Sequence, residues 1–277
     1  MKEANENPIK ILFITQEIFP YLPETEISNI CRKLPQSVQE RGHEIRTFMP
    51  RYGNVNERRN QLHEVIRLSG MNLIIDDNDH PLIIKVASMQ SARMQVYFID
   101  NDDYFLNRAI VANDNGEEYA DNDERVIFYV RGVMETVKKL RWAPDIIHCH
   151  GWITALAPLY VKKAYYDDPF FKHAKIVYSV YEDGFKSPFP ETFHQKLMID
   201  GIENDHVEML KKCVDYKTLT KFAIEYSDGI IQGSENIDNE VRQYIDEKGV
   251  PFLEHCCGEN YIEQYGDFYT TIIKLNR

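Results

Sequence analysis

Apolar positions at the start of the chain form first a continuous run and then a helical spacing. Residues 9–14 are apolar with one interruption, which is typical of a strand buried on both faces of a parallel sheet. Apolar residues then recur three and four positions apart, which predicts a helix over about residues 28–41, and a second strand follows over residues 44–49. This order predicts a right-handed βαβ unit, whose ligand crevice lies beyond the carboxyl ends of the strands. The loop 15–26 is therefore expected to face a site.

The next stretch changes to short β-rich runs that are separated by turn residues. These runs cover residues 62–68, 73–75, 82–87 and 95–99. Their spacing predicts antiparallel hairpins, inserted over about residues 60–105 and appended to the parallel sheet.

The second half of the chain returns to alternating helix and strand. Asp121 is placed to cap a helix that ends near Leu140, with Glu124 three positions on as in a capping box. The further elements expected are strands at 144–150, 176–181 and 229–231, helices at 152–163, 192–197, 206–214 and 216–226, and a helix from a cap at Ser234 to Asp246. The fold class is thus α/β, with one Rossmann-like parallel sheet flanked by helices over residues 1–277.

The first fifty residues also carry a series of short motifs. They are Ile11-Leu12-Phe13-Ile14, Glu17 with Pro20, Leu34-Pro35, Arg41-Gly42-His43 and Pro50-Arg51-Tyr52. Their order resembles the start of bacterial glycogen synthases and plant starch synthases. This family consists of ADP-glucose-dependent glucosyltransferases with two Rossmann-like domains, the GT-B type. The resemblance implies that the chain is one half of a GT-B enzyme, the N-terminal half.

The loop after the first strand departs from that family. The family has Lys-Thr-Gly-Gly-Leu there, and its lysine and glycine amides approach the donor diphosphate. The same five places here are Pro23, Glu24, Thr25, Glu26 and Ile27. The lysine and both glycines are missing and two carboxylates are present, so we expect ADP-glucose to bind weakly or not at all.

A histidine motif at the end of a predicted strand also resembles the family. His148-x-His150-Gly151-Trp152-x-Thr154 matches His-x-His-Asp-Trp-x-Thr, in which the second histidine lines the sugar site. The resemblance makes His150 a candidate catalytic residue and Trp152 and Thr154 candidate ligand-binding residues. In the alternative interpretation, both histidines satisfy structural hydrogen bonds and Trp152 belongs to the core.

Two further segments give candidate contacts. The family's Thr-Ile-His-Asn is replaced by residues 179–182, where Tyr181 can still pack on or bond to a sugar. Asp121, Asn122 and Arg125 keep the form of the family's Asp-Asn-x-x-Arg helix start. Asp121 and Asn122 either contact ligand or cap the helix.

Composition excludes several classes of function. A net charge of −12 and a pI near 5.3 oppose a nucleic-acid or anionic-membrane partner, and no apolar run is long enough to span a membrane. Five cysteines without a C-x-x-C pair favour reduced thiols, and the polar start lacks a signal peptide, so we expect a cytoplasmic location. No cofactor or metal is expected, because G-x-G-x-x-G and P-loop motifs are missing and Asp102 and Asp103 are adjacent rather than spaced as D-x-D.

The end of the chain limits what can follow the sheet. The 46 residues after Ile231 fall below the usual domain minimum of about 50, so we do not expect the family's nucleotide-binding domain. Residues 259–274 resemble instead the family's closing helix, which packs back on the first domain.

These features lead to three functional hypotheses. The first is a degenerate single-domain relative that binds α-glucan or another saccharide without transferase activity of its own. The second is a glucosyltransferase half completed by another chain, and the third is an oligomeric scaffold. The face that a second domain would shield carries aromatic residues on its expected rim: Phe19, Tyr21, Phe185, Phe189 and Phe193. We expect a homodimer or a partner chain there.

Overall fold

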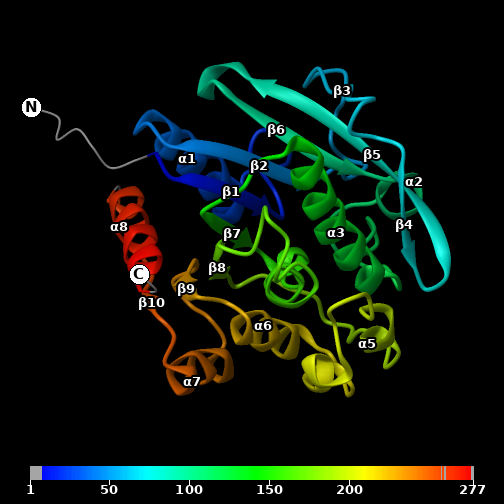
Figure 1. Ribbon diagram of the computed structural model, residues 1–277. Coiled ribbons are helices and arrows are strands. Elements are labelled where there is room, and N and C mark those ends of the chain that lie inside the picture. Colours follow the sequence, from blue (N-terminus) through cyan, green and yellow to red (C-terminus); the bar gives the residue numbers. More distant parts are fainter. Residues whose placement is uncertain (1–7, 257, 259, 276–277) are drawn as a thin grey trace, which may run out of the picture.

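The computed structural model describes residues 8–256, 258 and 260–275, and its centre is one ten-stranded sheet (Figure 1). The strands are β1 (Lys10–Thr15), β2 (Glu44–Pro50), β3 (His63–Glu64), β4 (Met71–Ile75), β5 (Asn78–Met89), β6 (Met94–Asp100), β7 (Ile146–His150), β8 (Lys175–Val180), β9 (Gly229–Gln232) and β10 (Phe252–Leu253). Their order is β10-β9-β8-β7-β1-β2-β6-β5-β3, and β4 pairs with β5. The strands from β10 to β6 are parallel to their neighbours, which confirms the α/β class.

Helices cover both faces of this sheet. They are α1 (Glu26–Glu40), α2 (Asp102–Phe105), α3 (Asn122–Leu140), α4 (Ala157–Leu159), α5 (Phe193–Lys196), α6 (Tyr216–Glu225), α7 (Asn239–Lys248) and α8 (Tyr261–Lys274), with 3-10 turns at Gln90–Ala92, Trp152–Thr154 and Asn204–Leu210 and a π turn at Tyr160–Ala164. α1 packs against α8, whereas α3 packs against β4, β6 and α5, and α6 packs against α4 and β8. α1 and α8 thus share one face, and α3 and α6 lie on the other (Figure 1). None of the described helices is both long and apolar enough to cross a membrane.

The predicted βαβ unit forms the middle of the sheet. β1 is buried from its second residue on and pairs in parallel register with β2 on one side and β7 on the other. The chain therefore leaves β1 in one direction and returns to it from the other, which makes the carboxyl ends of β1 and β7 a topological switch point. Residues after Thr15 and His150 are the first to look into that crevice.

The hairpin insertion is present and continues the parallel sheet. β6 pairs in parallel with β2 and antiparallel with β5, and β5 pairs with β4. Buried Arg51 lies 3.0 Å from Asp100, and Lys85 bridges Asp100 to Glu57, so ion pairs join the loop after β2 to the hairpin. The strand predicted at 62–68 is reduced to two residues.

The closing helix α8 is also present, although Glu259 and Cys257 lie outside the described residues. Its Tyr269 hydroxyl lies 2.7 Å from His148 Nδ1, and its Ile272 packs on β9 at Gly229, where an added Cβ would lie 2.5 Å from that side chain. A helix from the far end of the sequence therefore seals the sheet beneath β7 and β9.

Three local predictions were wrong. The helix expected at 152–163 is broken into a 3-10 turn, the short α4 with Pro158 in its first turn, and a π turn. The helix expected at 206–214 is a 3-10 turn that starts at Asn204. Ser234 caps no helix, because α7 begins after Asp238, whose carboxylate accepts the first amides. β10 was not predicted.

Candidate functional site

Polar side chains converge where β1, β2, β7 and β8 end. Gln16 follows β1, Tyr52 follows β2, His150 ends β7, and Asp183 lies three residues beyond β8. Gln16, Tyr52 and His150 are buried and Asp183 is half-buried. They come from segments far apart in sequence, so only the sheet brings them together.

Each of these side chains has a buried polar atom that no protein group satisfies. The atoms are Gln16 Oε1, Tyr52 Oη, His150 Nε2 and Asp183 Oδ2. Buried polar atoms in native proteins are nearly always hydrogen-bonded, because each unpaired one costs about 1–3 kcal/mol. A group of them at a switch point is the physical mark of a site that takes a polar ligand.

Gly151 explains one departure from the family motif. Its φ is +86°, and a Cβ added there would lie 2.6 Å from Gln16 Oε1. The backbone N–H of Gln16 also donates to the His150 carbonyl at 3.0 Å. A side chain such as aspartate cannot occupy position 151 while Gln16 keeps this position, so the Gln16 side chain fills that place in the crevice.

His150 is a neutral histidine with one ring nitrogen engaged. Nδ1 lies 2.7 Å from the Tyr181 hydroxyl, whereas Nε2 has no hydrogen-bond partner within the protein. Burial lowers the pKa of His150 to about 3, so the ring is uncharged at neutral pH and can donate or accept through Nε2 according to its tautomer.

His148 is satisfied on both sides and is structural. Its Nδ1 meets Tyr269 and its Nε2 lies 2.8 Å from Ser179 Oγ. Burial, reinforced by the neighbouring His150, lowers its pKa well below the usual value. The two histidines of one motif therefore have different roles.

Two carboxyl groups flank these atoms. Burial raises the pKa of Glu17 to about 6, with the Thr25 hydroxyl opposing the shift and Asp183 adding to it. Burial likewise raises the pKa of Asp183 to about 6, with the neighbouring Trp152 amide and Gln16 side chain opposing the shift. Both groups change charge close to neutral pH, as groups at functional sites often do.

Trp152 and Thr154 are core residues in this structure. The Trp152 ring packs edge-on against Phe185 and lies near Phe189, which stacks on Phe185 with centroids 4.4 Å apart. Thr154 is buried and donates to the Gly151 carbonyl at 2.7 Å. Trp152 therefore offers no open face to a sugar.

The predicted aromatic rim was wrong for the same reason. Tyr21, Phe185, Phe189 and Phe193 are buried, and Phe19 is half-buried. The irregular segment 182–190 brings Phe185 and Phe189 onto Trp152, and Phe193 packs edge-on against Phe189. Tyr21 packs edge-on against Phe98. An exposed apolar patch of these residues is not present.

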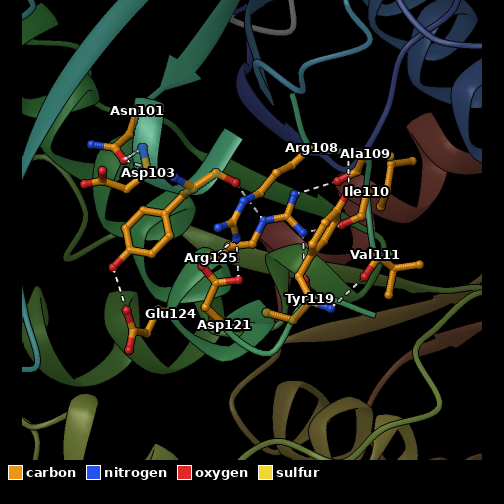
Figure 2. Close-up of polar contacts among 12 residues, drawn as sticks. Asn101, Asp103, Arg108, Ala109, Ile110, Val111, Tyr119, Asp121, Glu124 and Arg125 are labelled. Carbon is orange, nitrogen blue, oxygen red and sulfur yellow. Dashed lines mark hydrogen bonds and ion pairs between the residues drawn. The ribbon is translucent and has the colours of Figure 1, made fainter. Parts of the chain in front are cut away.

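Asp121 and Arg125 belong to a satisfied structural cluster (Figure 2), which Asn122 joins by accepting from Arg125. The Arg125 guanidinium is buried and donates to the carbonyls of Tyr104, Ala109 and Ile110 and to Asn122 Oδ1 at 2.6–2.9 Å. The capping prediction for Asp121 was wrong: its side chain makes no cap hydrogen bond, because both oxygens accept from Arg108. The Asn122 side-chain amide donates a hydrogen bond to the Val111 carbonyl at 2.9 Å.

Hydrogen bonds tie the five residues that replace the family's donor loop to α1 and to the loops after β1 and β9. Thr25 caps α1 through a reciprocal pair with Ser28, and its hydroxyl donates to Glu17 at 2.8 Å. The Ser234 hydroxyl donates to Glu26 at 2.5 Å, and Asn29 donates to Glu24. Pro23 is exposed and Ile27 is buried against the core.

Sequence reasoning missed most of the crevice. Gln16, Glu17, Tyr52 and Asp183 were not chosen as site residues, although each follows the carboxyl end of a predicted strand. Their position just after the end of a parallel strand is the sequence feature that could have identified them as site residues. Of the residues that were chosen, His150 and Tyr181 lie at the crevice.

Comparison with known proteins gives a consistent match. The family described as starch synthase catalytic domain matches residues 10–252. Glycogen synthase from Chlorobium phaeobacteroides is 33% identical over 229 residues, which are 80% of this chain and 47% of that protein. Glycogen synthase from Chlorobaculum tepidum is 33% identical over 257 residues, covering 91% of this chain and 51% of that protein.

A solved structure agrees on the fold. The catalytic domain of starch synthase IV from Arabidopsis thaliana, bound to ADP and acarbose, has a TM-score of 0.71 and 17% identity, with 91% of this chain and 52% of that chain covered. The chain spans about half the length of the curated relatives it matches.

Proposed function

The chain belongs to the starch synthase catalytic domain family, and on this premise we propose that it binds an α-glucan or a related saccharide without transferring glucose from ADP-glucose by itself. The observation that carries the proposal is the set of unpaired buried atoms on Gln16, Tyr52, His150 and Asp183. It supports a ligand that brings several hydrogen-bonding groups at once.

Sugar hydroxyls suit these atoms chemically. Gln16 Oε1 and ionised Asp183 Oδ2 only accept, whereas the Tyr52 hydroxyl can donate and accept. Each sugar hydroxyl is likewise both donor and acceptor, so adjacent hydroxyls can satisfy neighbouring acceptors and donors. Access requires that the segments covering this crevice move, because Gln16, Tyr52 and His150 are closed from solvent.

Free space lies next to Tyr181. A cavity of about 270 Å³ lies between the start of α1 and the loop after β9, with Glu26, Gly233 and Tyr265 in its wall. Gly233 lies against the Tyr181 ring, where an added Cβ would come within 2.3 Å. A small displacement of this loop would join the cavity to the His150–Tyr181 pair.

The donor side supports the lack of independent transfer. A diphosphate binds at a helix N-terminus through free amides and positive charge. The Thr25 and Ser28 side chains already accept from each other's backbone amides at the start of α1, and Glu26 places a carboxylate there. Nucleotide binding would have to overcome both the occupied cap and the negative charge.

Two separate calorimetric titrations test the proposal. Maltoheptaose is expected to bind saturably, and ADP-glucose is expected to show no binding in the micromolar range. A micromolar dissociation constant for ADP-glucose, or incorporation of labelled glucose into glycogen by the purified chain, would overturn the second half. Absence of saturable maltooligosaccharide binding would overturn the first.

A glucosyltransferase half completed by another chain is the second candidate. It is favoured by the match over residues 10–252 and by the position of His150 at the switch point. The chain would be mixed with the separately expressed C-terminal half of the Chlorobium phaeobacteroides glycogen synthase and assayed with labelled ADP-glucose. Transfer by the mixture but not by either part would favour this candidate.

Assembly and compartment belong to the same proposal. A homodimer or partner chain at the carboxyl edge would cover the segments that must open for sugar. Light scattering at micromolar concentration should then give a mass above the 32.6 kDa of one chain. Free buried thiols at Cys31 and Cys149 support a reducing, cytoplasmic location.

A further inference from the structure

A second polar cavity lies at the opposite end of the strands from the crevice. It measures about 430 Å³ and sits where β2 and β6 begin, beside the end of α1. The polar residues in its wall are Gln39, Arg46, Ser88, Arg93, Gln95 and Tyr97. Because Arg46 is near the start of β2 and Tyr52 follows its end, the strand separates this cavity from the crevice.

The wall is positively charged in a chain that is strongly negative overall. Arg46 and Arg93 both line the cavity, and none of the described residues that line it carries a carboxylate. Neither arginine forms an ion pair with any carboxylate of the described residues. Two unneutralised guanidinium groups facing one space, in a protein of net charge −12, attract an anion to that space.

Arg46 adds a polar atom with no partner in the protein. Its Nη1 donates to the Ile45 carbonyl at 2.8 Å, and its Cζ lies over the Trp142 ring, 5.3 Å from the ring centre. These two contacts fix the orientation of the guanidinium. Its Nε is buried and no protein acceptor satisfies it. Because Nε is closed from solvent, a ligand in the cavity meets the part of this fixed guanidinium that stays accessible, and a guanidinium is suited to an oxyanion.

The opposite wall is held rigidly. Ser88 and Met89 at the end of β5 pair with Gln95 and Met94 of β6. From α1, Arg32 donates to Met89 Sδ and to Ser91 Oγ, each at 3.0 Å. The turn that carries Arg93 is therefore tied to both α1 and the sheet, so a ligand meets a preformed wall.

We propose that this cavity binds a phosphate-bearing small molecule, through Arg46 and Arg93. Guanidinium groups match the oxygens of a phosphate in pairs, and the volume lies within the range of about 300–1,000 Å³ that small-ligand sites occupy. Gln39, Ser88 and Gln95 supply neutral hydrogen-bonding groups for the rest of such a molecule. The proposal is independent of saccharide binding at the crevice.

Calorimetry in low-salt buffer without phosphate tests it with three probes: glucose 1-phosphate, inorganic phosphate and glucose. Glucose 1-phosphate is expected to bind saturably and glucose is not. Tighter binding of glucose 1-phosphate than of inorganic phosphate assigns the site to a sugar phosphate, and equal binding assigns it to the free anion. No saturable binding of either phosphate at millimolar concentration overturns the proposal.

Two variants and a matched control locate the site. Arg93→Asn removes an exposed side chain at φ +50°, a backbone conformation that asparagine tolerates, and should weaken phosphate binding about tenfold. Arg46→Gln should do the same. Arg141→Asn is the control, because Arg141 is also exposed, has φ +52°, and does not line the cavity. Equal affinity in Arg93→Asn and the unsubstituted chain would overturn the assignment.

Discussion

Two buried polar clusters adjoin at the carboxyl edge of the sheet and differ in how far the chain satisfies them. The Arg125 guanidinium makes four hydrogen bonds within the protein (Figure 2). It also lies 5.8 Å from the ring centre of Tyr52, whose hydroxyl belongs to the crevice and has no protein partner. Both clusters include segments that resemble the same family, so resemblance alone does not separate them.

A structural network and a binding site differ in this chain by whether their buried polar atoms are paired within the protein. A closed network such as that of Arg125 stabilises the fold, because removing one member leaves several buried groups unpaired. An open network such as that of Gln16, His150 and Asp183 lowers stability until something binds. Substitutions in the Arg125 network should therefore lower stability more than ligand affinity. Substitutions in the crevice should lower ligand affinity more than stability.

The largest effect is expected from Arg125→Met. It leaves the carbonyls of Tyr104, Ala109 and Ile110 without their buried donor, and should lower the free energy of unfolding by about 3–5 kcal/mol. Urea denaturation at pH 7 measures it. Arg131→Met on the same helix is the control, since that partly exposed arginine donates to a single carbonyl, and a loss below 1 kcal/mol is expected there. Equal losses in both variants would contradict the comparison.

The next effect is a pH dependence from Asp183. Its folded pKa is raised to about 6 from 3.8, so the folded state holds the proton more tightly. The resulting stability is present below the unfolded pKa and is lost as pH rises through the folded pKa, by about 2 kcal/mol between pH 4.5 and 8. Asp183→Asn should therefore gain stability relative to the unsubstituted chain as pH rises.

Denaturation at both pH values measures this difference. Glu17→Gln should show the same sign, because burial also raises its pKa to about 6. Asp200→Asn is the control, since Asp200 is exposed. A difference that stays constant from pH 4.5 to 8 would show that Asp183 titrates as an ordinary carboxyl.

A smaller effect is expected on saccharide affinity. Gln16→Met removes the unpaired Oε1, and His150→Ala removes the unpaired Nε2 together with the Nδ1 contact to Tyr181. Each should weaken maltoheptaose binding about tenfold, the loss expected for one hydrogen bond of a ligand. Gln16→Met should leave stability within about 1 kcal/mol. Calorimetry compares these variants with Thr154→Val, which alters a core hydroxyl. If His150→Ala and Tyr181→Ala leave affinity unchanged, the sugar binds elsewhere.

The smallest effect is expected from Thr25→Ala in the replaced donor loop. Loss of the α1 cap should cost about 1 kcal/mol and leave maltoheptaose affinity unchanged. Thermal unfolding and the same titration measure both quantities, with the exposed Glu24→Ala as control. Micromolar ADP-glucose binding by Thr25→Ala would show that the cap alone had blocked the nucleotide.

The sheet and its order of elements could be predicted because they depend on periodicity. The run at β1, the stripe on α1 and the turn-bounded strands of the insertion are local patterns, and the structure keeps them. The closing helix also followed from a local pattern through its resemblance. Local patterns predicted most of these elements, but not the breaks in the helices expected at 152–163 and 206–214.

The site could be predicted only in part, because partners of side chains are set by tertiary contacts. The sequence predicts that Asp121 caps α3, yet its carboxylate instead accepts from Arg108, in the loop before α3. The sequence also predicts Ser234 as a helix cap, yet its hydroxyl donates to the Glu26 carboxylate and accepts from the Glu182 backbone amide. Which buried atoms remain unpaired follows from such contacts, and sequence alone does not contain them.

The late position of α8 in the sequence affects how the chain folds during its synthesis on the ribosome. His148 lies in β7, next to the central strand β1, and its Nδ1 has its hydrogen-bond partner only once Tyr269 is in place. At a synthesis rate of about 5–20 residues per second, the 121 positions between the two residues leave the nascent sheet uncovered on one face for several seconds. During this interval β7, β8 and β9 expose the apolar surface that α8 later buries. Ribosome-bound intermediates that end before residue 261 should therefore be the species that molecular chaperones recognise.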